Sequence, residues 1–188
     1  MRRHVAEVQR LVPGASLVVQ VDEPSLPAVL AGRLPTASGY GHLRAVDPQT
    51  AMSGLRDVLA AAPDGAATVV HCCDPAIPLP LLRATGVGAV ALDVTALGPA
   101  RWESIAATVE AGVQLYAGCL PTDGSGTVRG ATDLVVRGWS DAGMSPQGLA
   151  DITATPACGL PGLTPEGARR VLQSAVDVAA EWSQRAES

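Results

Sequence analysis

The sequence predicts an α/β protein of the (β/α)8 TIM-barrel type, containing about five parallel strands in a single domain that spans residues 1–188. Short apolar runs alternate with helical stretches, which is typical of a parallel sheet covered by helices on its faces. Apolar residues make up 47% of the chain and aromatic residues only 3%, so the core must be aliphatic. Polar residues follow the apolar runs directly, and strand ends of this kind carry the active sites of α/β folds.

The predicted strands are short runs of Val, Ala, Leu and Ile bounded by turn-forming residues. Because these runs are mainly apolar and alternate with helical stretches, they predict a parallel sheet that is covered on its faces. The predicted strands cover residues 17–21, 67–70, 87–92, 113–117 and 152–155.

Helices are predicted between the strands, mainly from their end signals. Asp47 before Pro48 predicts an N-cap with proline at the first helical position, and Thr164 before Pro165 predicts the same for the last helix. A loop over residues 121–130 is rich in Gly, Ser and Thr and is a candidate lid. The predicted helical stretches are 3–12, 25–32, 47–62, 78–85, 102–111, 132–142 and 164–185.

Candidate metal ligands follow the predicted strands. His71 and Cys73 should face the same side if the strand continues, because side chains alternate along a strand. Cys158 follows the last strand, Asp93 ends the middle one, and all of these are residue types that bind zinc. The alternative is that the cysteines are small buried side chains, and spacing alone does not decide between the two. The cysteines are Cys72, Cys73, Cys119 and Cys158.

Composition excludes several classes of function. The net charge of -5 and the absence of a basic run argue against a nucleic-acid partner. No apolar stretch approaches the roughly 20 residues that span a bilayer, and no apolar segment follows the charged N-terminus, so we expect a cytoplasmic protein. All 13 basic residues are Arg, which excludes Schiff-base chemistry on a lysine.

Four motifs together resemble the cobalamin-independent methionine synthase family, most of all its compact, actinobacterial-type members. Their order and approximate spacing fit across nearly the whole chain, and the His-x-Cys and Pro-x-Cys-Gly-Leu elements are the most specific. The motifs are VDEPSL at 21–26, HCC at 71–73, ALD at 91–93 and PACGL at 156–160.

The resemblance implies a barrel with a catalytic zinc that transfers a methyl group to the thiol of homocysteine, giving methionine. The donor would be methyltetrahydrofolate or another methyl carrier. His71, Cys73 and Cys158 would be zinc ligands, and Asp93 stands where the family has a glutamate ligand. Asp22 matches an aspartate that binds the amino group of homocysteine. Zinc would lower the pKa of the substrate thiol, so that the nucleophile is a thiolate at neutral pH.

Some features depart from the family pattern. About five strands are present where a barrel has eight, and by comparison with the family the first three βα units are missing. We therefore expect the C-terminal part of a barrel whose open sheet edge leads to self-association, or to a partner chain that completes it. Asp93 is one methylene shorter than glutamate. No general acid is evident near Cys119, and His42 is the only spare loop histidine.

The sequence is also compatible with two other interpretations of the function. One is a truncated, non-catalytic remnant or subunit that retains the barrel fold, which the missing strands favour. The other is a related zinc barrel that alkylates a different thiol. The ligand set that the resemblance implies, His71, Cys73 and Cys158, favours an enzyme.

Overall fold

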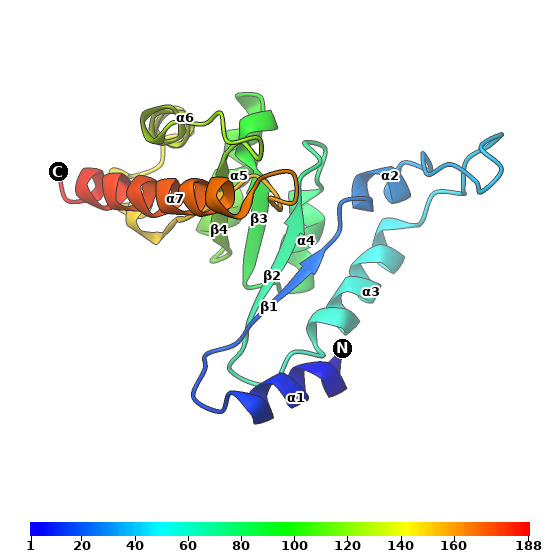
Figure 1. Cartoon of the computed structure of the whole chain (residues 1–188). Helices are drawn as coiled ribbons and strands as arrows, with labels where there is room; N and C mark the ends of the chain where they lie inside the picture. Colours follow the sequence, from blue (N-terminus) through cyan, green and yellow to red (C-terminus); the bar gives the residue numbers. More distant parts are fainter. The chain divides into compact units, whose positions relative to one another are not determined.

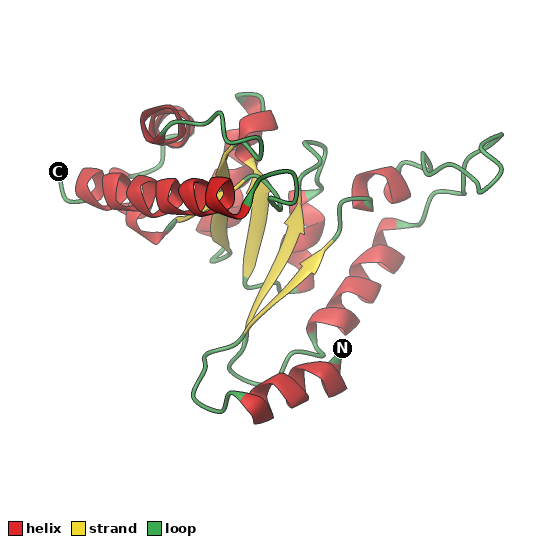
Figure 2. Cartoon of the chain, in the orientation of Figure 1, coloured by secondary structure: helices red, strands yellow, loops and turns green.

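The structure is a computed structural model that describes residues 1–188, in which strands and helices alternate along the chain (Figures 1 and 2). Five parallel strands form one sheet in the order β1-β2-β3-β4-β5. The predicted α/β class, with a sheet consistent with part of a TIM barrel, is therefore confirmed. The strands are β1 (Val18–Asp22), β2 (Ala67–Cys72), β3 (Ala89–Asp93), β4 (Gln114–Leu120) and β5 (Thr153–Pro156).

Helices occupy the segments between the strands. No helix has the length and apolar character that a transmembrane segment requires. The α-helices are α1 (Arg2–Leu11), α2 (Leu26–Leu30), α3 (Pro48–Leu59), α4 (Leu79–Thr85), α5 (Ala100–Glu110), α6 (Val128–Asp141) and α7 (Pro165–Ala186). Two short 3-10 helices are η1 (Val94–Ala96) and η2 (Pro146–Asp151).

The predicted helix caps are present in the structure. The Asp47 carboxylate accepts hydrogen bonds from the backbone N–H groups at the start of α3, and the Thr164 hydroxyl accepts one at the start of α7. The largest error in a predicted boundary is at α6, which begins at Val128 and not at 132, and so shortens the loop predicted over 121–130. The Thr127 hydroxyl caps this helix by accepting a hydrogen bond from the N–H of Gly130.

The chain divides into two compact units, each with its own buried side chains. The first contains Met1–Cys72 and Ala76–Val90, and the second contains Cys73–Pro75 and Ala91–Ser188. The core of the first unit includes Leu26, Leu55, Leu59, Val69, Val70, Leu79 and Leu82. The core of the second unit includes Leu92, Trp102, Ile105, Leu115, Val135, Trp139, Val178 and Trp182.

In the first unit, β1 and β2 pair in parallel, with Asp22 directly opposite His71. Glu23 continues this pairing past the end of β1, since its backbone N–H donates to the His71 carbonyl at 2.8 Å. Helices α3 and α4 pack together, whereas α1 has no buried residue and leaves Leu11 63% exposed. The polar end of β1 is thereby fixed beside the end of β2.

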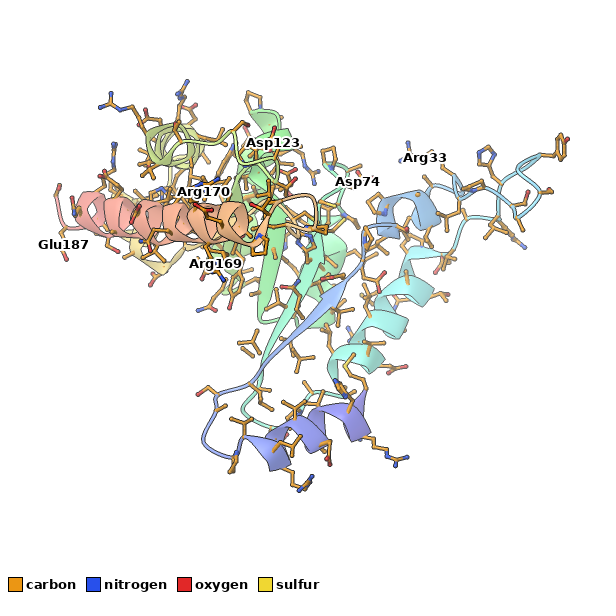
Figure 3. All side chains as sticks on the ribbon, viewed as in Figure 1. Arg33, Asp74, Asp123, Arg169, Arg170 and Glu187 are labelled. Carbon is orange, nitrogen blue, oxygen red and sulfur yellow. The ribbon has the colours of Figure 1, made fainter.

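In the second unit, β4 and β5 pair in parallel, with an irregularity in register after Gly118. A Cβ atom at Gly118 would lie 2.6 Å from the Leu92 carbonyl oxygen, so only glycine fits there. Helix α7 packs against α6, η2 and β5, while its charged Arg169 and Arg170 side chains project from it (Figure 3). The tight packing at β4 positions the chain that leads into Cys158.

Candidate metal centre

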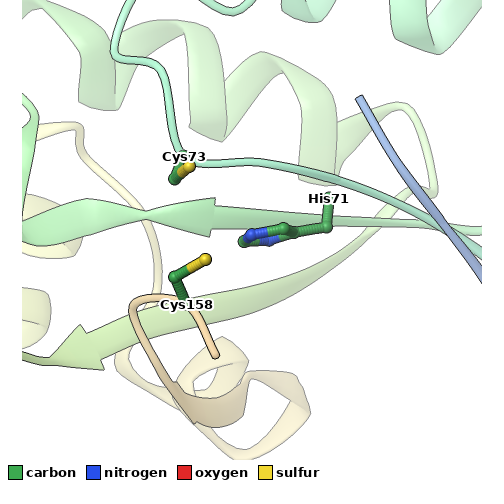
Figure 4. Close-up of side chains that lie close together, drawn as sticks. All are labelled: His71, Cys73 and Cys158. Atoms are coloured by element: carbon green, nitrogen blue, oxygen red, sulfur yellow. The ribbon is translucent and has the colours of Figure 1, made fainter. Parts of the chain in front are cut away.

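The structure brings together three of the residues predicted as metal ligands, which are His71, Cys73 and Cys158 (Figure 4). One ring nitrogen of His71 and the Sγ atoms of the two cysteines all lie within 4.8 Å of one another. An imidazole and two thiols at this spacing form a donor set that suits zinc.

Local backbone structure explains how these residues reach one another. His71 lies near the end of β2 and Cys73 follows that strand, while Cys72 between them is 1% exposed and buried in the core. This is the alternation expected of a strand. Cys158 follows β5, where the Ala157 N–H donates to the Leu120 carbonyl at 2.9 Å and holds the chain against β4. Both cysteines are free thiols, with Cys73 half-buried and Cys158 exposed.

The surroundings of Cys73 change the pKa of its thiol. Burial raises the pKa of the Cys73 thiol, and the neighbouring Cys158 thiol and Asp93 carboxylate raise it further. Without a cation, two thiolates and a carboxylate would repel one another, so the thiol form is favoured. A divalent cation reverses this balance, because it stabilises the thiolates that bind it.

Asp93 lies outside this group of three ligand atoms. Its Oδ1 accepts hydrogen bonds from the backbone N–H of Thr95 at 2.9 Å and from the Thr95 hydroxyl at 2.6 Å, which caps η1. The carboxylate is close enough to affect the Cys73 thiol. A direct role for Asp93 as a ligand stays a prediction.

Asp22 lies beside the candidate centre through strand pairing. It is opposite His71 in the parallel register, so the two side chains are on the same face of the β1–β2 pair. The Gln20 side chain donates a hydrogen bond from Nε2 to Asp22 Oδ1 at 2.8 Å. Gln20 was not identified from the sequence, although the two-residue period of a strand already places it on the same face as Asp22. Burial raises the pKa of the neighbouring Glu23 carboxyl.

The remaining candidate residues, His42 and Cys119, occupy different surroundings. His42 is exposed in the loop between α2 and α3, where its backbone forms an isolated antiparallel β-bridge with Pro35. Cys119 is 2% exposed, and burial raises the pKa of its thiol to about 11. It lines a cavity of about 490 Å³ together with Trp102. Cys119 is therefore a neutral thiol at physiological pH.

The protein is therefore an α/β protein with a parallel sheet. An imidazole and two thiols lie together at the ends of its strands and form a candidate metal centre. A family model described as the catalytic domain of cobalamin-independent synthase matches residues 2–181. The chain therefore belongs to this family, as its motifs predicted, and family membership indicates a methyltransferase. No curated protein shows significant sequence similarity to the chain.

Proposed function

We propose that the chain is a zinc-dependent methyltransferase domain that transfers a methyl group to the thiol of homocysteine and so produces methionine. The methyl donor would be methyltetrahydrofolate or another methyl carrier. The observation that carries this proposal is the group formed by His71, Cys73 and Cys158 in a chain of the cobalamin-independent synthase family.

In this proposal, His71, Cys73 and Cys158 hold the zinc and leave a position for the substrate thiol. Bound zinc supplies a positive charge that keeps a thiol deprotonated at neutral pH. Asp93 provides a carboxylate at the edge of the group, either as a ligand or as a charge near Cys73. The exposure of Cys158 supports access of a substrate from its side of the group.

Asp22 is proposed to bind the ammonium group of homocysteine. Its carboxylate is exposed and lies on the same face of the β1–β2 pair as His71. An ammonium bound there would direct the rest of a short amino acid toward the ligand group, since the two residues are opposite neighbours in the sheet. Orientation of the thiol would then be set by two contacts, one with Asp22 and one at the metal.

The first test is zinc content, measured in protein expressed with added zinc. We expect about one zinc per chain, because three ligands and an open position form a catalytic zinc site. Cys158→Ser should lose the metal, whereas Cys119→Ala should retain it, because Cys119 lies outside the group. Zinc that survives in Cys158→Ser, or is absent from the wild-type protein, would contradict the proposed site.

The second test is transfer of a methyl group to homocysteine by the zinc-loaded protein. Methyltetrahydrofolate and other methyl carriers would be compared as donors, with methionine as the measured product. Zinc binding together with alkylation of a different thiol would instead assign the chain to a related zinc-dependent reaction. Zinc binding with no alkylation of any thiol would identify a non-catalytic domain.

A further inference from the structure

We propose that Gln20 is a positioning residue, which fixes the Asp22 carboxylate so that it can receive the ammonium group of an amino-acid substrate. This inference rests on the proposed function, because it takes Asp22 as the residue that binds the substrate ammonium. Gln20 would act through Asp22 and would not need to touch the reacting sulfur.

The geometry of β1 supports this role. Gln20 and Asp22 are two residues apart on a strand, so their side chains project from the same face. In the parallel register they lie opposite Val69 and His71 respectively. The Gln20 Nε2 atom is 2.8 Å from Asp22 Oδ1, and no other hydrogen bond to the Asp22 carboxylate is present. Oδ2 of Asp22 is therefore left for a ligand.

The hydrogen bond from Gln20 restricts the side-chain conformation of Asp22, and this restriction matters because Asp22 is exposed. An exposed aspartate rotates among several side-chain conformations, and a ligand that needs one of them must offset the lost freedom. A hydrogen bond from Gln20 favours one conformation before the substrate arrives. Affinity then rises without any new contact to the substrate.

The chemical type of the residue at position 20 also fits the proposal. A glutamine amide donates a hydrogen bond but carries no charge. No arginine forms an ion pair with Asp22, so no cationic side chain competes with a ligand for its carboxylate. A neutral donor therefore orients this carboxylate without competing electrostatically with a cationic ligand.

The test compares two ligands of the zinc-loaded protein by calorimetry. L-homocysteine carries an amino group, whereas 4-sulfanylbutanoic acid has the same thiol and carboxylate without it. Gln20→Met removes the amide and keeps a chain of similar length. We expect Gln20→Met to weaken homocysteine binding about 10-fold, the loss of roughly one hydrogen bond, and to leave 4-sulfanylbutanoic acid unaffected.

Asp22→Asn should weaken homocysteine binding more strongly, and adding Gln20→Met to it should cause little further loss, because both changes act on one interaction. Gln49→Met, at an exposed glutamine of α3, serves as the matched control and should bind both ligands like the wild type. Zinc content and unfolding temperature should be the same in Gln20→Met and the control, which separates positioning from loss of structure.

Two results would overturn the role of Gln20 alone. One is homocysteine binding by Gln20→Met at wild-type affinity, and the other is an equal loss of affinity for both ligands. A third result, in which the wild-type zinc-loaded protein binds neither ligand, would overturn the proposed function and the role of Gln20 with it. The wild-type measurement therefore distinguishes the two failures.

Discussion

Cys119 and Cys158 carry the same thiol in opposite surroundings. Cys119 is buried within β4, where its Sγ is 3.9 Å from the Thr155 carbonyl oxygen, whereas Cys158 is exposed beside two other candidate ligands. Burial penalises the charged thiolate, so the pKa of Cys119 rises from 9.0 to about 11. Location, and not residue type, makes one thiol a packing residue and the other a candidate ligand.

The raised pKa of Cys119 predicts a loss of stability at high pH. The stability contributed by the buried neutral thiol is complete below the unfolded-state pKa near 9, and it is lost as the pH rises toward about 11. The free energy of unfolding should fall by about 2 kcal/mol over this range. Urea unfolding of wild type and Cys119→Ala at several pH values would measure it. A parallel fall in both proteins would contradict the prediction.

At the scale of single residues, the sequence predicted the candidate ligands but not all of their hydrogen bonds. His71 and Cys73 were placed on one face by strand alternation, Cys158 was a candidate because it follows a predicted strand, and the resemblance to a family then implied all three as ligands. The hydrogen bonds from Thr95 to Asp93 could not be predicted, because they depend on the turn that follows β3. Asp93 caps η1 in the structure, and its predicted role as a ligand stays untested.

At the scale of elements, α5 and α6 approach each other where Trp102 meets Gly138. A Cβ atom added to Gly138 would overlap the indole ring of Trp102. Trp102 is 5% exposed and cannot move away without leaving the core. The absence of a side chain at position 138 therefore sets how closely the two helices pack.

Gly138→Ala should destabilise the protein by about 1–3 kcal/mol, because the added methyl group overpacks this contact. Gly54→Ala is the matched control, since Gly54 is exposed within α3 and has no atom within 4 Å of the added Cβ. That substitution should stabilise the protein by roughly 0.5–1 kcal/mol through helix propensity. Chemical denaturation of the wild type and of both variants would measure their free energies of unfolding. Equal effects of the two substitutions would refute the role assigned to Trp102.

Most elements were predictable because their signals are local. The Asp-Pro and Thr-Pro pairs marked the starts of α3 and α7, and the apolar runs marked all five strands. The start of α6 was predicted too late, because Thr127 follows a run of glycine and serine that resembles a longer loop. Its capping hydrogen bond to Gly130 became evident only in the structure.

At the scale of the whole molecule, the linear strand order leaves β1 and β5 with a neighbouring strand on one side only. Two exposed apolar side chains, Val8 of α1 and Val18 of β1, line the same hollow and are 37% and 56% exposed. An open edge beside exposed apolar side chains promotes pairing with another polypeptide. Self-association stays a prediction, and this edge is the surface on which we expect it.

Sedimentation velocity should show association that increases with protein concentration. Val18→Lys should reduce it, because a charged side chain on an edge strand disfavours pairing with another strand. Val176→Lys, at a similarly exposed valine of α7, is the control and should leave association unchanged. A wild-type protein that remains monomeric at all concentrations would contradict this prediction.

The sequence predicted a parallel sheet correctly because each strand and helix has its own pattern. The single domain over residues 1–188 stays a prediction, while packing groups the chain into two compact units. The chain crosses between the units after Cys72, after Pro75 and after Val90, and the last crossing lies inside β3, where no proline or glycine marks it. Such a division depends on packing between distant residues, which a local pattern does not encode.

The placement of the tryptophans offers a way to observe this division. Trp102, Trp139 and Trp182 are all buried, and all belong to the second unit. Indole fluorescence therefore reports the unfolding of that unit alone, while far-ultraviolet circular dichroism reports helices from both. Coincident transitions by the two signals would mean that the chain unfolds as one cooperative domain, and separated transitions would mean that it does not.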